Sequence, residues 1–161
     1  MSQSINLYKQ LANHKLFNKS VNFGLKRIKL ALALLGHPEK KLKNVISVVG
    51  ESGKFTTLFS LKSFIEASNQ KVTTHISPSL RDIRERFYMG EKYLNHKEIK
   101  KTIKQIEKLN IPLTIFECLT LVYIINASKI NVDYNIQETG ALWRLDSTIS
   151  MTSQKFKFVQ I

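Results

Sequence analysis

The chain has 161 residues, a formal net charge of +13 and 43% hydrophobic residues. This apolar content excludes a disordered basic tail, and a chain of this length can build one ordinary domain core. The single cysteine, Cys118, excludes an intramolecular disulfide framework and a cysteine metal cluster, which favours a cytoplasmic location. No stretch approaches the roughly 18 uninterrupted apolar residues of a membrane span, so no membrane association is predicted.

The first half of the chain predicts a helix, a buried strand and a second helix. Apolar residues recur at helical spacing over residues 23–35, and Gly36 and Pro38 then end the pattern. Residues 45–49 form a β-branched run that is too short for a helix and apolar on both faces, as in a buried parallel strand. A glycine turn follows at once, and one apolar helical face returns over residues 56–70.

The second half predicts two further strands and two helices around a charged loop. Strands are expected at residues 71–76 and 132–138, and a long charged loop at 77–86. Residues 96–109 predict a surface helix with lysines on its outer faces, whereas the next helix, 113–125, is apolar nearly all round. Alternating strands and helices imply an α/β fold with a mostly parallel sheet flanked by helices.

The turn after residues 45–49 carries the pattern of a phosphate-binding loop. Backbone N–H groups of a glycine turn that opens a helix form a cradle for anions, and Gly50, Gly53 and Lys54 fit this description. The common P-loop has a glycine where Val48 stands and a hydroxyl residue where Phe55 stands, so the match to that motif is partial. A plain turn with an exposed lysine remains the alternative.

Five segments, in order, resemble the folylpolyglutamate synthase and dihydrofolate synthase family, relatives of the Mur ligases. In that family the phosphate loop is similar to A-G-T-N-G-K-G-S-T, a later helix carries F-E-x-L-T, and a further loop carries E-V-G-L-G-G-R-L-D-A-T-N. The matching segments are the leucine-rich helix with its stop at 22–38, the phosphate loop at 49–57, the loop elements 77–80 and 84–86, the helix motif at 116–120 and the loop at 138–149.

The resemblance implies a Mur ligase-like central domain of the P-loop type. Residues 1–149 would form an incomplete part of this ATP-binding domain, and residues 150–161 a divergent tail. The implied activity is an ATP- and Mg²⁺-dependent ligation, in which a carboxylate of folate or dihydropteroate is phosphorylated and the acyl phosphate is attacked by the amino group of glutamate. The family's chain continues into a further domain, so this chain is expected to be a fragment that is inactive alone, unless a second polypeptide completes the site.

The resemblance also implies roles for individual residues. Lys54 is expected to be catalytic by neutralising terminal phosphate charge, and Thr56 and Glu117 are expected to bind Mg²⁺ through oxygen. A buried Glu117 needs a metal or a basic partner, and pairing with a nearby lysine is the structural alternative. The nucleotide is expected at Gly50, Ser52, Gly53, Lys54, Thr56 and Thr57, and the substrate at Ser77, Pro78, Arg86, Arg144 and Asp146.

Other functions remain open. Lysines within residues 97–108 and 39–43 offer a phosphate-contacting face for nucleic acid, but no aromatic stacking platform or recognition-helix pattern accompanies them, so this partner is not favoured. A third interpretation is nucleotide binding without catalysis, as a partner of a complete enzyme. The four histidines lack metal-ligand spacing, so no zinc is assigned, and Cys118 is interpreted as an inert core thiol.

Overall fold

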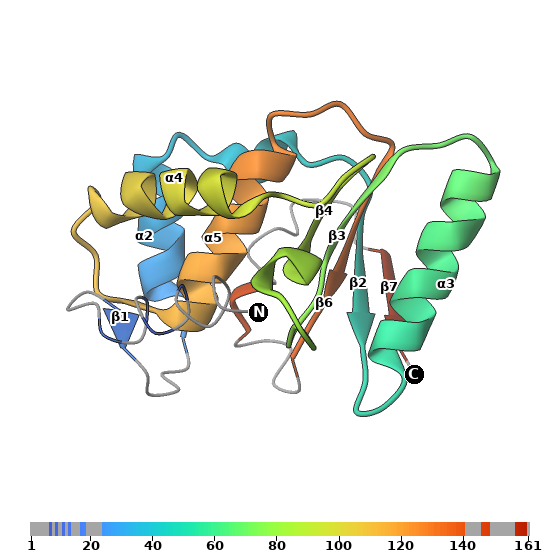
Figure 1. The fold of residues 1–161 in the computed structure, drawn as a ribbon, viewed down its shortest axis with the longest axis horizontal. Coiled ribbons are helices and arrows are strands. Elements are labelled where there is room, and N and C mark those ends of the chain that lie inside the picture. The colour runs from blue at the N-terminus through green and yellow to red at the C-terminus, as the bar shows by residue number, and fades with distance from the viewer. Residues whose placement is uncertain are drawn as a thin grey trace.

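A mostly parallel sheet forms the centre of the molecule (Figure 1). The structure, a computed structural model, describes residues 24–140 and 146–148, the single residues Leu7, Lys9, Leu11 and Asn13, and the backbone of residues 17–18 and 157–160. The described sheet has five strands in the order β4-β3-β6-β2-β7. Four are parallel, namely β2 (Val45–Val49), β3 (Val72–His75), β6 (Tyr134–Glu138) and β7 (Lys157–Gln160), and β4 (Phe87–Met89) is an antiparallel edge strand. The predicted α/β fold is confirmed.

Helices cover both faces of this sheet (Figure 1). α3 (Lys54–Ala67) lies on one face, whereas the other face carries α2 (Lys26–Leu34), α4 (His96–Glu107) and α5 (Ile115–Ala127). α5 is buried on nearly all sides because α2 and α4 pack against it. A short parallel pair, β1 (Phe17–Asn18) with β5 (Leu113–Thr114), leads into α5, and short 3-10 helices lie at Pro38–Lys41 and Ile83–Arg86.

The sheet separates two hydrophobic cores. The larger core is built around α5, and α4 contributes to it Ile99, Ile103 and Ile106, the spacing that predicted an amphipathic helix. The smaller core joins a single fully buried residue of α3, Leu58, to the central strands; its other buried members are Ile46, Val48, Val72, Ile76 and Ile136. The glycine turn is therefore held between β2 and α3, which packs on the sheet through Leu58 and the partly buried Phe59, Leu61 and Ile65.

Some element boundaries differ from the sequence prediction. β4 was not predicted, because a three-residue edge strand gives too short a pattern to recognise. α5 begins at Ile115, two residues later than expected, since the Thr114 side chain caps it. Residues 157–160 lie in the predicted tail, and they pair with β2 as β7. The domain boundary at residue 149 stays a prediction.

Polar side chains are buried between the sheet and α5. His75, at the end of β3, is fully buried between the rings of Phe87 and Tyr123, whose centroids lie 5.7 and 5.0 Å away. Its Nδ1 lies 3.2 Å from the carbonyl oxygen of Arg86, to which an Nδ1–H can donate. Burial, together with the neighbouring Arg86 charge, lowers the pKa of His75 to about 3. The imidazole is thus neutral in the folded protein at neutral pH.

Acid is expected to destabilise the protein through His75. An unfolded histidine has a pKa of about 6.5, so between this pH and about 3 the unfolded state binds one proton more than the folded state. Stability contributed by the neutral His75 is complete above pH ~6.5 and falls by up to about 1.4 kcal/mol per pH unit below it. Urea unfolding between pH ~7 and ~4.5 should show a shallower decline for His75→Gln than for the wild type. If the free energy of unfolding fell equally with pH in both proteins, the low pKa of His75 would be contradicted.

Candidate functional site

The glycine turn after β2 has the geometry of an anion cradle. β2 ends at Val49 and α3 begins at Lys54, so the turn joins the carboxyl end of a parallel strand to a helix N-terminus (Figure 1). Gly53 precedes the helix with a φ of 77°, a conformation that favours glycine. The N-terminal end of α3 carries the positive end of the helix dipole and unpaired N–H groups. The predicted residues Gly50, Ser52 and Gly53 therefore lie together where an anion is stabilised.

Lys54 folds back onto this turn. Its Nζ donates hydrogen bonds to the carbonyl oxygens of Gly50 at 2.8 Å and Glu51 at 3.2 Å, and it lies 4.0 Å from Oε1 of Glu138. The ammonium group is thus held beside the cradle by neutral carbonyl acceptors. A phosphate oxygen would be a stronger acceptor for the same charge.

The first turn of α3 places hydroxyl groups beside the cradle. Thr56 is exposed and Thr57 is half-buried, and the Thr57 backbone N–H donates to the Gly53 carbonyl oxygen at 3.0 Å. Phe55, which departs from the P-loop motif, is 42% exposed and packs on Phe59 with ring centroids 4.4 Å apart. Because Phe59 lies one turn further along the helix, the Phe55 ring leans along α3.

Glu138 is a site residue that the sequence analysis did not assign. It ends β6, lies opposite Val48 of β2 and is 8% exposed. Its Oε1 faces Lys54, and its Oε2 accepts a hydrogen bond from the Ser77 backbone N–H at 3.1 Å. The sequence did show a strand that ends in a carboxylate. It did not show that β6 lies directly beside β2, which is what places this carboxylate at the cradle.

Ser77 and Arg86 meet at the same edge of the sheet. Arg86 is 7% exposed, and its Nη1 donates to the Ser77 hydroxyl at 3.2 Å. Ser77 and the adjoining Pro78 follow the carboxyl end of β3, beside Glu138. Three predicted substrate residues, Ser77, Pro78 and Arg86, are thus grouped next to the cradle.

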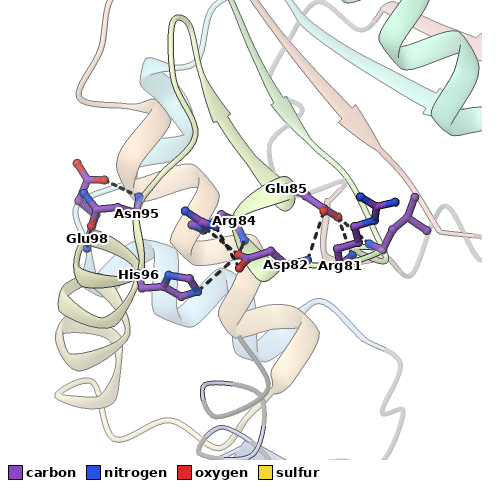
Figure 2. Close-up of polar contacts among 8 residues, drawn as sticks. Arg81, Asp82, Arg84, Glu85, Asn95, His96 and Glu98 are labelled. Carbon is purple, nitrogen blue, oxygen red and sulfur yellow. Dashed lines mark hydrogen bonds and ion pairs between the residues drawn. The ribbon is translucent and has the colours of Figure 1, made fainter. Parts of the chain in front are cut away.

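The carboxylates of the charged loop fix its own conformation (Figure 2). Glu85 accepts hydrogen bonds from the backbone N–H groups of residues 80–82 at 2.8 to 3.3 Å. Asp82 accepts from Arg84 at 2.9 Å and lies 3.5 Å from the His96 ring at the start of α4. These contacts hold the loop that carries Ser77 and Arg86 against the rest of the domain.

Glu117 lies in the first turn of α5 and is 3% exposed. Its backbone N–H donates to the Thr114 hydroxyl at 3.1 Å, and its Oε2 accepts from the Thr114 backbone N–H at 2.7 Å. The same Oε2 accepts from Nε of Arg27 at 3.1 Å. The structural alternative for Glu117, pairing with a basic residue, is therefore observed, with an arginine in place of a lysine. Within the described residues no contact joins Glu117 to Thr56.

Asp146 closes the loop that follows β6. Its Oδ2 accepts from the Gly140 backbone N–H at 2.9 Å, and its Oδ1 accepts from the backbone N–H and hydroxyl of Thr148 at 2.9 and 2.7 Å. A Cβ added at Gly140 would overlap the Asp146 carboxylate, so a larger residue there would displace the Asp146 side chain from this hydrogen bond. Arg144, also predicted to contact substrate, lies outside the described residues.

Residues 24–140 and 146–148 contain no group of three or more histidine, cysteine, aspartate or glutamate side chains placed to hold a metal ion. Cys118 is fully buried, and burial raises the pKa of its thiol, as expected for an unreactive core residue. In the described part of the chain, no helix has both the length and the apolar character needed to cross a bilayer.

A parallel sheet, a glycine turn at its carboxyl edge and a lysine that opens the next helix define a P-loop-type α/β domain. No family model matches the chain. Curated relatives do match it: the dihydrofolate synthase/folylpolyglutamate synthase of Escherichia coli is 33% identical over 135 residues, which cover 83% of this chain and 32% of the relative. The enzyme of the same name from Buchnera aphidicola is 35% identical over 129 residues, covering 78% of this chain and 30% of the relative.

The solved structures that match this chain are also folylpolyglutamate/dihydrofolate synthases. The structure of E. coli FolC in complex with DHPP and ADP matches with a TM-score of 0.82 and 32% identity, over 91% of this chain and 35% of that chain. The Yersinia pestis bifunctional folylpolyglutamate synthase/dihydrofolate synthase complexed with AMPPNP and Mn ion matches with a TM-score of 0.83 and 27% identity, over 96% of this chain and 37% of that chain. This chain is a homologue of part of these folylpolyglutamate/dihydrofolate synthases, as its motifs predicted, and spans about a third of the length of the curated relatives.

Proposed function

We propose that this chain is the nucleotide-binding part of an ATP-dependent ligase that adds glutamate to folate or dihydropteroate. The observation that carries the proposal is the glycine turn at the end of β2, where Lys54 lies beside an anion cradle and 4.0 Å from Glu138. Similarity to dihydrofolate synthase/folylpolyglutamate synthases supports the choice of reaction. The E. coli neighbour holds ADP, and the Yersinia pestis neighbour holds AMPPNP.

Mg²⁺ is the proposed cofactor beside the nucleotide. This ion takes oxygen ligands, commonly one or two from the protein with phosphate and water completing the shell. The Glu138 carboxylate at the cradle and the Thr56 hydroxyl on the first turn of α3 fit that donor set. We place Glu138, rather than Glu117, in this role because Glu138 lies at the cradle beside Lys54, whereas Glu117 is paired with Arg27 and has no contact with Thr56 among the described residues. When bound, the ion would neutralise charge on the phosphate oxygens.

The proposed reaction has two steps. A carboxylate oxygen of the substrate attacks the terminal phosphorus of ATP, and ADP leaves. The amino nitrogen of glutamate then attacks the acyl carbon, phosphate leaves with the C–O electron pair, and the nitrogen loses a proton. Lys54 would act in the first step by neutralising charge on the terminal phosphate oxygens. Arg86, held beside Ser77, would face the acyl phosphate, with Pro78, Arg144 and Asp146 bordering the substrate.

The chain spans about a third of the length of the curated relatives. A second polypeptide that supplies the rest of the ligase is the proposed partner. Without such a partner, the proposal is reduced to nucleotide binding without ligation. The exposed lysines of α4 are accounted for by solvation of a surface helix, and no compared relative is named as a nucleic-acid-binding protein. A cytoplasmic site of action agrees with the single cysteine.

Calorimetric titration with MgATP tests the nucleotide site. Saturable binding is expected, and Lys54→Ala should weaken it at least about tenfold because it removes the charged donor to phosphate. Lys104→Ala, on the exposed face of α4, removes an equal charge away from the cradle and should leave binding unchanged. No binding by a folded wild type would refute the proposal, and salt-sensitive retention of DNA or RNA that ignores Lys54 would favour nucleic acid instead.

A further inference from the structure

Glu51 brings a carboxylate to the glycine turn. It follows Gly50 directly, and its backbone carbonyl oxygen accepts a hydrogen bond from Lys54 Nζ at 3.2 Å. Since a carbonyl oxygen lies two bonds from its own Cα, the Glu51 side chain branches beside the Lys54 ammonium group. The residue is exposed, and within the described residues no basic group pairs with its carboxylate. Its negative charge therefore acts on any anion that approaches the turn.

The charges around the cradle are balanced. Glu138 Oε1 lies 4.0 Å from Lys54 Nζ, so two carboxylates accompany this ammonium group. A second cation, Arg86, is held at the Ser77 hydroxyl beside Glu138. These two cations and two carboxylates offset one another, although the chain as a whole carries a net charge of +13. A site that only attracted polyphosphate would have an excess of cations.

Such a balance distinguishes between two forms of a nucleotide. A metal-free triphosphate carries its full negative charge, so each carboxylate of the site repels it. A divalent cation cancels two of the negative charges of the triphosphate and is itself attracted by carboxylates. The repulsion by Glu51 therefore acts most strongly on the metal-free form.

We propose that Glu51 is a specificity residue that makes the cradle prefer the metal complex of a nucleoside triphosphate over the metal-free form. The inference rests on the proposed function, because it concerns the nucleotide of that site. Glu51 acts through the charge of its carboxylate and is not a ligand of the ion; that role belongs to Glu138 and Thr56. The family motif A-G-T-N-G-K-G-S-T has an uncharged threonine where Glu51 stands, so the resemblance does not imply this preference.

The test titrates wild type and Glu51→Gln with MgATP, and with ATP in the presence of EDTA. Glutamine keeps the size of the side chain and removes its charge, and the exposed position accommodates it. The variant should bind metal-free ATP at least about fivefold more tightly than the wild type, and MgATP within about twofold. In ~1 M salt, where the screening length falls to about 3 Å, the gain for metal-free ATP should largely disappear.

Glu91→Gln is the matched control. Glu91 forms an exposed ion pair with Lys71 at 2.6 Å, and Lys71 directly precedes β3. This is the amino end of a strand that runs parallel to β6, and β6 runs parallel to β2, so the pair lies at the opposite end of the sheet from the cradle. Removing the Glu91 charge should leave both affinities unchanged.

The results separate this inference from the proposed function. If Glu51→Gln gains no affinity for metal-free ATP, the proposal is overturned. A variant that instead loses affinity for MgATP would overturn it too, because Glu51 would then be a ligand of the ion. Lys54-dependent binding of MgATP alongside either result refutes only the role of Glu51. Absence of nucleotide binding by a folded wild type refutes the proposed function, and this inference with it.

Discussion

Arg27→Met is expected to lower the free energy of unfolding by about 3 kcal/mol. The Arg27 side chain is 22% exposed and its Nε donates to a carboxylate that is only 4% exposed. Methionine retains most of the apolar stem but leaves the Glu117 charge buried, with the Thr114 backbone N–H as its one remaining donor among the described residues. Breaking one partner of a buried ion pair costs more than the pair itself contributes, because the remaining charge stays desolvated. Urea denaturation monitored by circular dichroism measures the loss.

Two controls identify the source of this loss. Arg84→Met removes an arginine that pairs with Asp82 at 2.9 Å but is 48% exposed, so it should change stability little (Figure 2). Combining Arg27→Met with Glu117→Gln removes the stranded charge and should recover part of the loss. If the double variant is as unstable as the sum of the single variants, the ion pair is not what Arg27 contributes.

The order of the main elements was predictable from periodicity and composition. The β-branched run at 45–49, the helical spacing of Ile99, Ile103 and Ile106 and the apolar run in α5 each carry a pattern that specifies both the element and its degree of burial. β4 could not be predicted in this way. Its three residues are a strand only because β3 pairs with them, and that pairing is a long-range property of the fold.

The residues of the cradle could be predicted because they are close in sequence, whereas the residues that contact the cradle from other elements could not. Gly50, Gly53 and Lys54 are consecutive or nearly so, hence local sequence places them together. Glu138 reaches Lys54 only through the pairing of β6 with β2, and Arg27 reaches Glu117 only through the packing of α2 on α5. The partner of a carboxylate is determined by such packing, so the sequence could predict that Glu117 needs a metal or a basic partner but could not identify Arg27.

The cradle should also depend on how α3 is anchored. Leu58→Ala is expected to lower the free energy of unfolding by about 3 kcal/mol, because it removes a fully buried side chain and leaves a cavity between α3 and the sheet. Leu58 is the single fully buried residue of α3, and the other apolar side chains of the helix that pack on this core, Phe59, Leu61 and Ile65, are only partly buried. Denaturant titration of the wild type and the variant gives the difference.

Phe64→Ala supplies the comparison on the same helix. Its side chain is larger than that of Leu58 but 73% exposed, and its removal should change stability by no more than about 0.5 kcal/mol. A loss at Phe64 equal to that at Leu58 would show that the exposed side of α3 is packed in solution. Leu58→Ala should also weaken MgATP binding at temperatures where the variant stays folded. The reason is that Lys54 and the N-terminus of α3 move with the helix, which Leu58 helps to hold against the sheet.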